Sequence, residues 1–304
     1  MIRDLSLGSL LLATLCLASA QPAEARRSSR PARVRAMTFN IRYDFESDGQ
    51  NRWQYRAEAV AKTVAASGAK VVCLQEDKAH QIEDLQRLLP EFTFVGRGRN
   101  ATGSGERCSI AFDSKAFRLR EHGDLWLSDT PGVPGSNTWG DRYPRKATWA
   151  LLELRKGKQK LLVVNTHLPE GNSDRLRVRG GEVIHAWLSE HLAGDESSRR
   201  RGRRGGDGPA VIVAGDFNDD AGSTVHDRLT GPELGLRDVW EETPPVDRSP
   251  GTYGGFQGLQ TTSRIDWLLV GGRVRVLAAA KVAEQVDDRW PSDHYPVIAD
   301  LEVH

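Results

Sequence analysis

The sequence predicts an α/β protein in which mixed β-sheets are covered by helices. Short apolar runs alternate with stretches of helical periodicity along most of the chain. Several predicted strands follow one another directly, which argues against a purely parallel sheet with a helix after every strand. Residues 70–75 and 211–214 are almost continuously apolar, which is typical of strands buried on both faces.

The individual elements follow from periodicity and from their boundaries. The helix predicted over residues 52–66 places its apolar side chains on one stripe, and the helix over 80–89 ends before Pro90, which cannot continue a helix. A third, amphipathic helix is predicted over 175–192. The predicted strands cover residues 34–41, 70–75, 92–95, 109–112, 147–154, 161–165, 211–214, 265–270, 274–280 and 297–301.

Composition excludes several classes of protein. The chain has 304 residues, with 42 Lys and Arg against 41 Asp and Glu, and 38% hydrophobic residues. This balance excludes a disordered chain and gives no sign of a globally basic nucleic-acid binder. Three cysteines are too few for a disulfide scaffold. The mean hydropathy of −0.50 excludes a protein with many membrane spans.

Residues 1–25 have the features of a secretory signal peptide and its cleavage region. An apolar stretch over 5–18 precedes two small-residue cleavage motifs, at 18–20 and 23–25. The stretch is shorter than the roughly 20 residues that a transmembrane helix needs. An uncleaved N-terminal anchor is the alternative. We therefore expect a secreted or periplasmic protein without a membrane span after cleavage.

The rest of the chain is expected to form a basic linker, residues 26–33, and one domain, residues 34–304. Within it, Cys73 and Cys108 lie in apolar runs and are predicted to be buried free thiols, although an exported protein could join them. Residues 197–208 contain five arginines and are predicted to form a solvated loop. Contact of this loop with an anionic polymer or lipid headgroups is the alternative.

Polar residues interrupt or follow the apolar strands at six places. A carboxylate at the end of a buried strand is costly to desolvate unless a cation or a donor meets it. Each segment alone is more often a turn or a structural contact, but six at strand ends indicate a shared polar pocket. The segments are 38–40 (TFN), 74–76 (LQE), 165–167 (NTH), 215–218 (GDFN), 264–267 (RIDW) and 292–294 (SDH).

The residue types in these segments suit metal-assisted hydrolysis of a phosphate ester. Glu76 and Asn40 offer the hard oxygen ligands that Mg²⁺ and Mn²⁺ prefer, and no zinc-type Cys or His spacing is present. Asp216 and Asn218 are two residues apart and could face one site across a turn. A metal that neutralises charge and an aspartate that activates water are the parts that such a reaction needs.

Two histidines complete the set of candidate groups. His167 and His294 could donate to phosphate oxygens or transfer protons near neutral pH. Asp266 or Asp293 could orient one of them. An imidazole that is held in this way can stabilise the charge that develops on a phosphate oxygen.

The six segments, in this order, resemble the endonuclease/exonuclease/phosphatase superfamily, the metal-dependent phosphoesterases that include deoxyribonuclease I. The resemblance runs from about residue 34 to residue 301. Further segments, such as 40–44 (NIRYD), 125–128 (LWLS) and 251–256 (GTYGGF), resemble a secreted bacterial branch with some likeness to deadenylase-type nucleases. The resemblance implies a four-layer α/β sandwich, with two mixed β-sheets packed face to face, helices outside and the catalytic groups at one end.

The resemblance also implies roles for the residues at the metal and at the attacking water. Glu76 would be the principal metal ligand, with Asn40 beside it and Asp293 near the metal. Asp216 would orient or deprotonate the water, and Asn218 would position the phosphate.

The histidines receive roles from the same resemblance. His167 would contact a phosphate oxygen or serve the leaving group. Asp266 would hold His294, which would contact the scissile phosphate or act as a base. The division of acid and base between the two histidines stays open.

Four further residues are predicted to bind substrate. Arg145 precedes a strand that the family places beside the site, where a guanidinium could bind phosphate through two hydrogen bonds. Trp139, Tyr253 and Phe256 lie in predicted loops, where their rings could stack on a base or a sugar. A surface arginine and packing aromatics are the alternatives.

The sequence departs from the family pattern directly after His167. Residues 168–172 (LPEGN) stand where close relatives often carry an aspartate and another histidine. This departure leaves the substrate more open than the reaction.

The expected function is that of a secreted Mg²⁺- or Mn²⁺-dependent phosphoesterase, with nuclease-like hydrolysis of phosphodiesters as the preferred form. The alternatives are a phosphomonoesterase or a lipid or sugar phosphodiesterase on the same site, and, less favoured, an inactive member that only binds its ligand. The expected partner is a phosphate ester, with nucleic acid as one candidate. Nothing in the sequence indicates an obligate protein partner.

Overall fold

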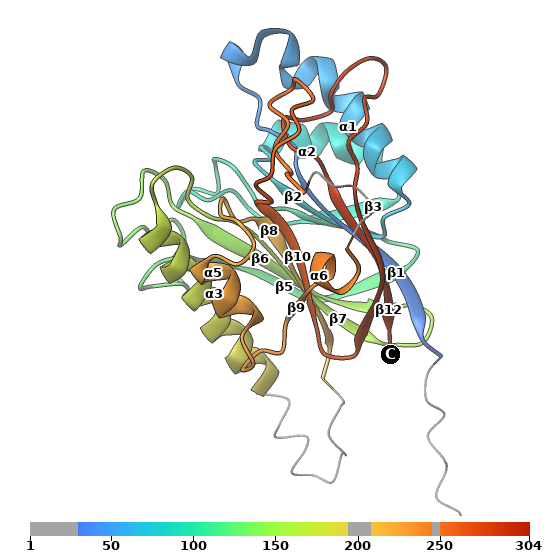
Figure 1. Ribbon diagram of the computed structural model, residues 1–304, viewed down its shortest axis with the longest axis vertical. Helices are drawn as coiled ribbons and strands as arrows, with labels where there is room; N and C mark the ends of the chain where they lie inside the picture. The colour runs from blue at the N-terminus through green and yellow to red at the C-terminus, as the bar shows by residue number, and fades with distance from the viewer. Residues whose placement is uncertain (1–29, 194–207, 245–249) are drawn as a thin grey trace, which may run out of the picture.

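The computed structural model describes residues 30–193, 208–244 and 250–304, which form two six-stranded sheets packed face to face with helices outside. Figure 1 shows α1 and α2 on one side of the sandwich and α3 and α5 on the other. The predicted four-layer α/β sandwich is therefore confirmed. The predicted signal peptide and most of the arginine-rich segment 197–208 lie outside the described residues.

The first sheet has the order β11-β12-β1-β2-β4-β3. Strands β1 and β2 are parallel, and the other neighbours are antiparallel. Strand β1 begins at Ala32, two residues before the predicted start. The strands are β1 (Ala32–Asn40), β2 (Val71–Gln75), β3 (Phe92–Val95), β4 (Ile110–Asp113), β11 (Val274–Lys281) and β12 (Val297–Val303).

The second sheet has the order β5-β6-β7-β8-β10-β9 and repeats this arrangement. Its parallel pair is β7 and β8, and the other neighbours are antiparallel. The strands are β5 (Phe117–Trp126), β6 (Lys146–Leu154), β7 (Lys160–His167), β8 (Ala210–Asp216), β9 (Arg237–Asp238) and β10 (Asp266–Gly271).

Three hydrophobic layers hold the sandwich together. The largest lies between the sheets, where side chains such as Val71 and Ile110 meet Leu152 and Val163. A second layer joins α1 and α2 to the first sheet, and a third joins α3 and α5 to the second. The helical elements are η1 (Glu46–Asn51), α1 (Trp53–Ser67), α2 (Ala79–Leu88), α3 (Asp174–Ala193), α5 (Thr224–Thr230) and α6 (Val239–Glu242).

Strand β5 is the main element that the sequence did not predict. Its central residues are polar and largely exposed, because β5 is an edge strand. A register shift between Leu119 and Glu121 also interrupts the alternation of buried and exposed positions. A bulge of this kind removes the period of two on which strand prediction depends.

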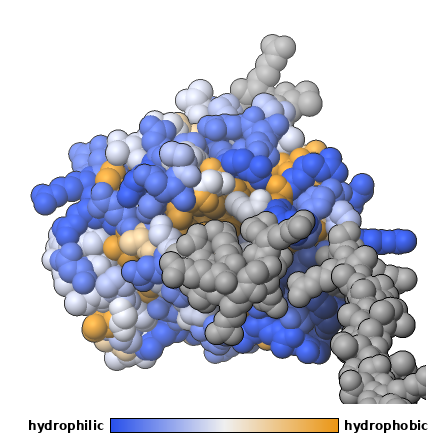
Figure 2. Space-filling model, turned by 90° about the horizontal axis from the view of Figure 1, so that it is seen from below, coloured by the Kyte–Doolittle hydropathy of each residue, from blue (hydrophilic) through white to orange (hydrophobic). Residues whose placement is uncertain are grey.

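Two further expectations can be compared with the structure. Cys73 and Cys108 are free and buried, as predicted, and burial raises the pKa of both thiols. Across the described ranges, no helix combines the length and the apolar character needed to cross a membrane. The face in Figure 2 is predominantly hydrophilic, with small hydrophobic patches between the polar residues.

Candidate functional site

The topology brings the six polar segments to one edge of the sandwich. The parallel strands β1 and β2 both end there, and so do β7 and β8. The antiparallel strand β10 begins there, because Asp266 pairs with Asp216. Strand β12 also begins there, because Val297 pairs with Thr38. Side chains from both sheets therefore meet, as expected for the ends of neighbouring strands.

Asn40 links Glu76, the candidate metal ligand, to Asp216, the candidate water-activating group. Its Nδ2 atom donates to Glu76 Oε1 at 3.1 Å and to Asp216 Oδ2 at 2.9 Å. Glu76 lies directly after β2 in the left-handed region, with φ of 63°. A non-glycine residue in this region costs on the order of 1–3 kcal/mol and is found where the surroundings hold it. Here the backbone N–H of Tyr43 donates to Glu76 Oε2 at 3.1 Å.

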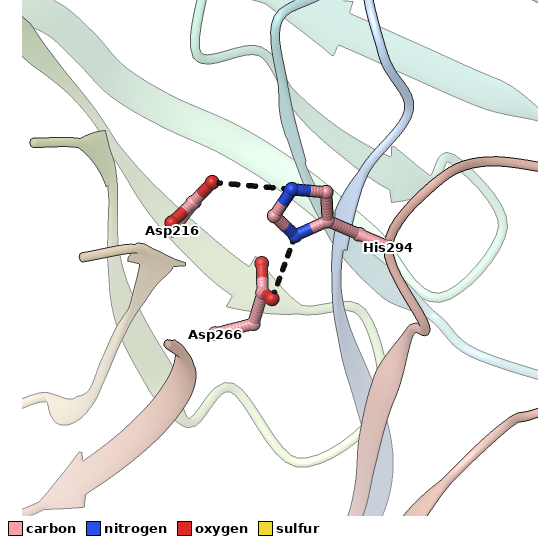
Figure 3. Close-up of side chains that lie close together, drawn as sticks. All are labelled: Asp216, Asp266 and His294. Atoms are coloured by element: carbon pink, nitrogen blue, oxygen red, sulfur yellow. Dashed lines mark hydrogen bonds and ion pairs between the residues drawn. The ribbon is translucent and has the colours of Figure 1, made fainter. Parts of the chain in front are cut away.

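His294 lies between two carboxylates, and each ring nitrogen faces one of them (Figure 3). Its Nδ1 atom is 2.9 Å from Asp266 Oδ2, and its Nε2 atom is 3.8 Å from Asp216 Oδ2. All three side chains are buried. The arrangement matches the orientation of a histidine by Asp266, one of the two options left open by the residue types.

Burial and charge shift the pKa values of these groups in the metal-free protein. Burial, followed by the facing charge of Asp266, raises the pKa of Asp216 to about 7. Burial lowers the pKa of His294, but the carboxylates of Asp266 and Asp216 outweigh it and raise that pKa well above its usual value. His294 is therefore held as an imidazolium near neutral pH.

His167 faces the same carboxylate from the second sheet. Its Nε2 atom is 3.7 Å from Asp216 Oδ2. Burial, together with the positive charges of Arg145 and His294, holds the pKa of His167 well below its usual value. The two histidines are therefore different: His167 is a neutral imidazole, whereas His294 is charged.

Asn218 and Asp293 lie at the border of this cluster. The Asn218 backbone N–H donates to Asp216 Oδ1 at 2.9 Å, but its side-chain Nδ2 donates to the Leu168 carbonyl at 3.0 Å. The Asn218 amide thus holds the loop that follows His167. Asp293 Oδ1 accepts from Ser292 Oγ at 3.2 Å.

A pocket of about 310 Å³ opens beside Glu76 and His167. Arg145 is 7% exposed and lines it, and the Nε atom of Arg145 is 3.4 Å from Asp141 Oδ2. The sequence predicted Arg145 as a substrate-binding residue. It did not predict most of the other residues that line the pocket, which come from four separate loops. The pocket is lined by Arg42, Tyr43, Phe45, Glu76, Arg99, Glu106, Arg142, Tyr143, Arg145, His167 and Glu170.

The three predicted stacking residues have different surroundings. Tyr253 is 41% exposed, and its ring lies edge-on to His294 at 5.2 Å. The Trp139 ring is covered by the guanidinium of Arg179 at 4.2 Å, and the Phe256 ring contacts Arg56 at 5.5 Å. Of the three, Tyr253 is the ring that contacts a catalytic candidate.

The donor set fits a divalent cation. The carboxylates of Glu76 and Asp216 converge on the amide nitrogen of Asn40, and the carboxylates of Asp216 and Asp266 lie within 4.8 Å of each other in a buried cluster with His294. Asp266 Oδ1 is buried and accepts no hydrogen bond from any described residue. Carboxylate oxygens at such spacings suit a hard cation.

A second cluster, His226, Asp238 and Glu241, has a structural explanation. Asp238 Oδ2 is already held by Arg264 at 2.7 Å and by His226 at 3.0 Å. Its negative charge is therefore compensated by a guanidinium within the protein. The Asp238 cluster therefore does not need a cation. The cluster at the edge between the two sheets is the better candidate for a cation site.

A family model described as the endonuclease/exonuclease/phosphatase family matches residues 37–294. The chain belongs to this family. It is therefore a metal-dependent phosphoesterase by family, and the buried Asp and His cluster is consistent with a divalent metal site of such enzymes.

Solved structures of other family members are similar to this chain. A family protein from Bacteroides thetaiotaomicron is 25% identical, with a TM-score of 0.78, over 91% of this chain and 97% of that one. A mannosyl-6-phosphatase from Bacteroides thetaiotaomicron VPI-5482 is 27% identical, with a TM-score of 0.74, over 88% of this chain and 99% of that one.

One curated relative is a larger protein. The probable exoribonuclease subunit Ccr4 of the CCR4-Not complex from Vairimorpha ceranae (strain BRL01) is 25% identical over 197 residues. The match covers 58% of this chain but only 38% of that protein. Membership of a secreted bacterial branch stays a prediction.

Proposed function

We propose that this chain is an exported Mg²⁺- or Mn²⁺-dependent phosphatase that hydrolyses the phosphomonoester of a small molecule. The observation that carries the proposal is the pocket beside Glu76 and His167, in which the nearly buried Arg145 forms one wall. Its volume of about 310 Å³ suits a small leaving group rather than a polymer. The sequence by itself favours nuclease-like hydrolysis, with a phosphomonoesterase as an alternative.

The residues of the cluster divide the work of hydrolysis. Glu76 and Asp216 would hold the cation, with Asn40 positioning both carboxylates, and the cation would neutralise charge on the phosphate when bound. Asp216 is also placed to orient a water and accept its proton. The imidazolium of His294, positioned by Asp266, would donate to a phosphate oxygen as negative charge develops there.

The pocket wall provides a reason to favour monoesters. A monoester phosphate carries one more anionic oxygen than a diester, and a guanidinium binds two such oxygens at once. The Nε atom of Arg145 donates to Asp141. The Arg145 side chain lines the pocket next to His167. Similarity to a protein named as a mannosyl-6-phosphatase agrees with this choice.

Nuclease-like hydrolysis remains the second candidate, because Tyr253 presents an exposed ring beside His294. Stacking of a base on an aromatic ring contributes about 1–3 kcal/mol to single-strand binding. The curated relative that is named as a probable exoribonuclease supports this candidate.

The test is an assay of the purified mature chain with Mg²⁺, Mn²⁺ or EDTA. The substrates are p-nitrophenyl phosphate, bis-p-nitrophenyl phosphate, hexose 6-phosphates, single-stranded DNA and RNA. We expect metal-dependent release of phosphate from the monoesters. Cleavage of DNA or RNA with little monoesterase activity would replace this proposal by the nuclease.

Arg145→Ala should further distinguish a phosphomonoesterase from a nuclease, with Arg145→Lys as the matched variant. The alanine variant should lose at least tenfold more kcat/KM on p-nitrophenyl phosphate than on the diester, because it loses a charged contact of about 1.5–3 kcal/mol. Lysine keeps the charge but not the paired hydrogen bonds, so its loss should be intermediate. Equal losses on both esters would contradict the monoester assignment.

Export is proposed from the sequence of residues 1–25. Expression of the full chain in a bacterial host should give a processed protein in the periplasm or the medium, with a new N-terminus after residue 20 or residue 25. A full-length chain that stays with the cytoplasmic fraction would contradict export.

A further inference from the structure

We infer that the pocket beside Glu76 binds a polyhydroxylated ring as the leaving group, and that Glu170 selects it. The substrate class is then a sugar phosphomonoester. This inference rests on the proposed phosphatase function. It assigns a role to the loop after His167, where the sequence departs from the family pattern.

The loop presents Glu170 to the pocket on a fixed backbone. The buried guanidinium of Arg177 donates to the carbonyl of Pro169 at 3.1 Å and to that of Gly171 at 2.8 Å, the two neighbours of Glu170. Asp219 Oδ2 accepts from Arg177 Nε at 3.0 Å. Gly171 has φ of 70°, a left-handed conformation that glycine adopts without cost.

A second contact holds the start of this loop. The Asn218 side chain donates to the Leu168 carbonyl at 3.0 Å, and the Leu168 backbone N–H donates to the Asp216 carbonyl at 2.9 Å. The loop is therefore attached to the residues that surround the catalytic carboxylate. These contacts hold the backbone on either side of Glu170, so a ligand has to order only the glutamate side chain and not the loop.

The carboxylate of Glu170 is available to a ligand. It lines the pocket, is exposed, and makes no hydrogen bond or ion pair with any residue in the described ranges. The pocket's other acidic residues are already engaged. Glu106 binds Arg99 at 2.8 Å, and Glu76 accepts from Asn40 and from the Tyr43 backbone.

Aromatic rings and the side chains of Arg42, Arg99 and Arg142 form the other walls. Cations lie over the rings of Tyr43 and Tyr143. Phe45 is 40% exposed, and its ring lies 5.5 Å from that of Tyr43. The C–H faces of a sugar ring pack on such surfaces, and an ionised carboxylate accepts hydrogen bonds from hydroxyl groups. This combination favours a polyhydroxylated ring as the leaving group.

Recognition through hydroxyl groups gives a defined test of Glu170. A site that is built to bind hydroxyl groups discriminates strongly against substrates that lack them. Glu170→Ala should lower kcat/KM for hexose 6-phosphates about 10- to 100-fold, mainly through KM, as expected for the loss of a hydrogen bond to a charged group. Hydrolysis of p-nitrophenyl phosphate, which has no hydroxyl groups on its ring, should change less than about twofold.

Glu170→Gln separates charge from shape, and Glu190→Ala is the matched control. Glu190 is an exposed glutamate on α3 that does not line the pocket. The glutamine variant keeps the shape of the side chain but accepts weaker hydrogen bonds, so it should lose only part of the hexose phosphate preference. Glu190→Ala should behave as the wild type on every substrate.

Binding gives a second readout that does not depend on turnover. Calorimetry in the Asp216→Asn background, in which hydrolysis should be largely lost, should show that hexose 6-phosphate binds the protein with Glu170 at least tenfold more tightly than the protein that also carries Glu170→Ala. If hexose 6-phosphate binds equally well with and without Glu170, the inference is overturned. It is also overturned if Glu170→Ala loses equal activity on hexose phosphates and on p-nitrophenyl phosphate. Neither result contradicts the proposed phosphatase activity. Hexose phosphate binding that depends on Glu170 without any hydrolysis would overturn the proposed function and leave the pocket assignment in place.

Discussion

Gln75 and Asn165 join the two sheets directly behind the edge that carries the candidate site. Gln75 Nε2, at the end of β2, donates to Asn165 Oδ1 on β7 at 2.7 Å. Both side chains are fully buried, and Asn165 also donates to the Leu74 carbonyl at 2.7 Å. The contact links the strand that carries Glu76 to the strand that carries His167.

Gln75→Leu should therefore destabilise the fold. The change leaves Asn165 Oδ1 buried without its donor, which costs about 1–3 kcal/mol. Urea unfolding with EDTA present measures the difference. Gln86→Leu, at an exposed position on α2, is the control and should be close to neutral. An unchanged unfolding midpoint for Gln75→Leu would show that the buried pair adds no net stability.

Asp216→Asn should abolish most hydrolysis without unfolding the protein. The side chain keeps its size but can neither accept a proton from water nor contribute charge at the metal, so we expect kcat to fall at least about 100-fold. Assays at saturating Mg²⁺ measure this loss. Asp288→Asn, at an exposed position, should keep wild-type rates. Near-wild-type kcat for Asp216→Asn would remove Asp216 from the catalytic set.

The same substitution should change how stability depends on pH. The folded-state pKa of Asp216 is raised to about 7. The folded protein therefore binds the proton of the Asp216 carboxyl group more tightly than the unfolded chain does. The stability that this proton contributes is complete below the unfolded pKa, near 4, and is lost as pH rises through 7. In EDTA, Asp216→Asn should therefore raise Tm at pH 8 relative to the wild type, with a smaller difference at pH 4. A gain of the same size at both pH values would contradict the raised pKa.

Asp266→Asn should shift the pH profile of activity. The neighbouring carboxylates raise the pKa of His294, so removal of one of them lowers it. The imidazolium is then lost at lower pH, and the alkaline limb of kcat/KM should move toward lower pH. Asp238→Asn is the matched control, because Asp238 belongs to the other buried His–Asp pair, 3.0 Å from His226. That variant should lower stability but keep the wild-type profile.

Glu76→Gln should raise the Mg²⁺ concentration that is needed for activity. Loss of even an outer contact of a metal site lowers affinity about 10- to 100-fold, so loss of a ligating charge should cost at least as much. A metal titration of initial rates measures the midpoint. Glu190→Gln should give the wild-type midpoint. An unmoved midpoint for Glu76→Gln would exclude Glu76 as a ligand.

Local patterns predicted most of the fold. The buried strands β2 and β8 were visible as apolar runs, and α1 and α2 as periodic stretches with definite ends. Strand β5 was missed because its exposed edge and its register shift remove the alternation of polar and apolar residues. The short helices α5 and α6 have too few turns to show a period.

The sequence alone indicates which polar groups meet at one edge of the sandwich, because six polar segments lie at strand ends and neighbouring strands share that edge. The tertiary structure decided how these groups differ: burial and the neighbouring charges make His294 cationic and His167 neutral. It also decided the pocket. Arg142, Tyr143 and Glu170 come from loops without a repeating pattern, and packing such as the Arg177 contacts sets where their side chains lie. Contacts between residues far apart in sequence have no local signature, so substrate selection becomes visible only in the folded molecule.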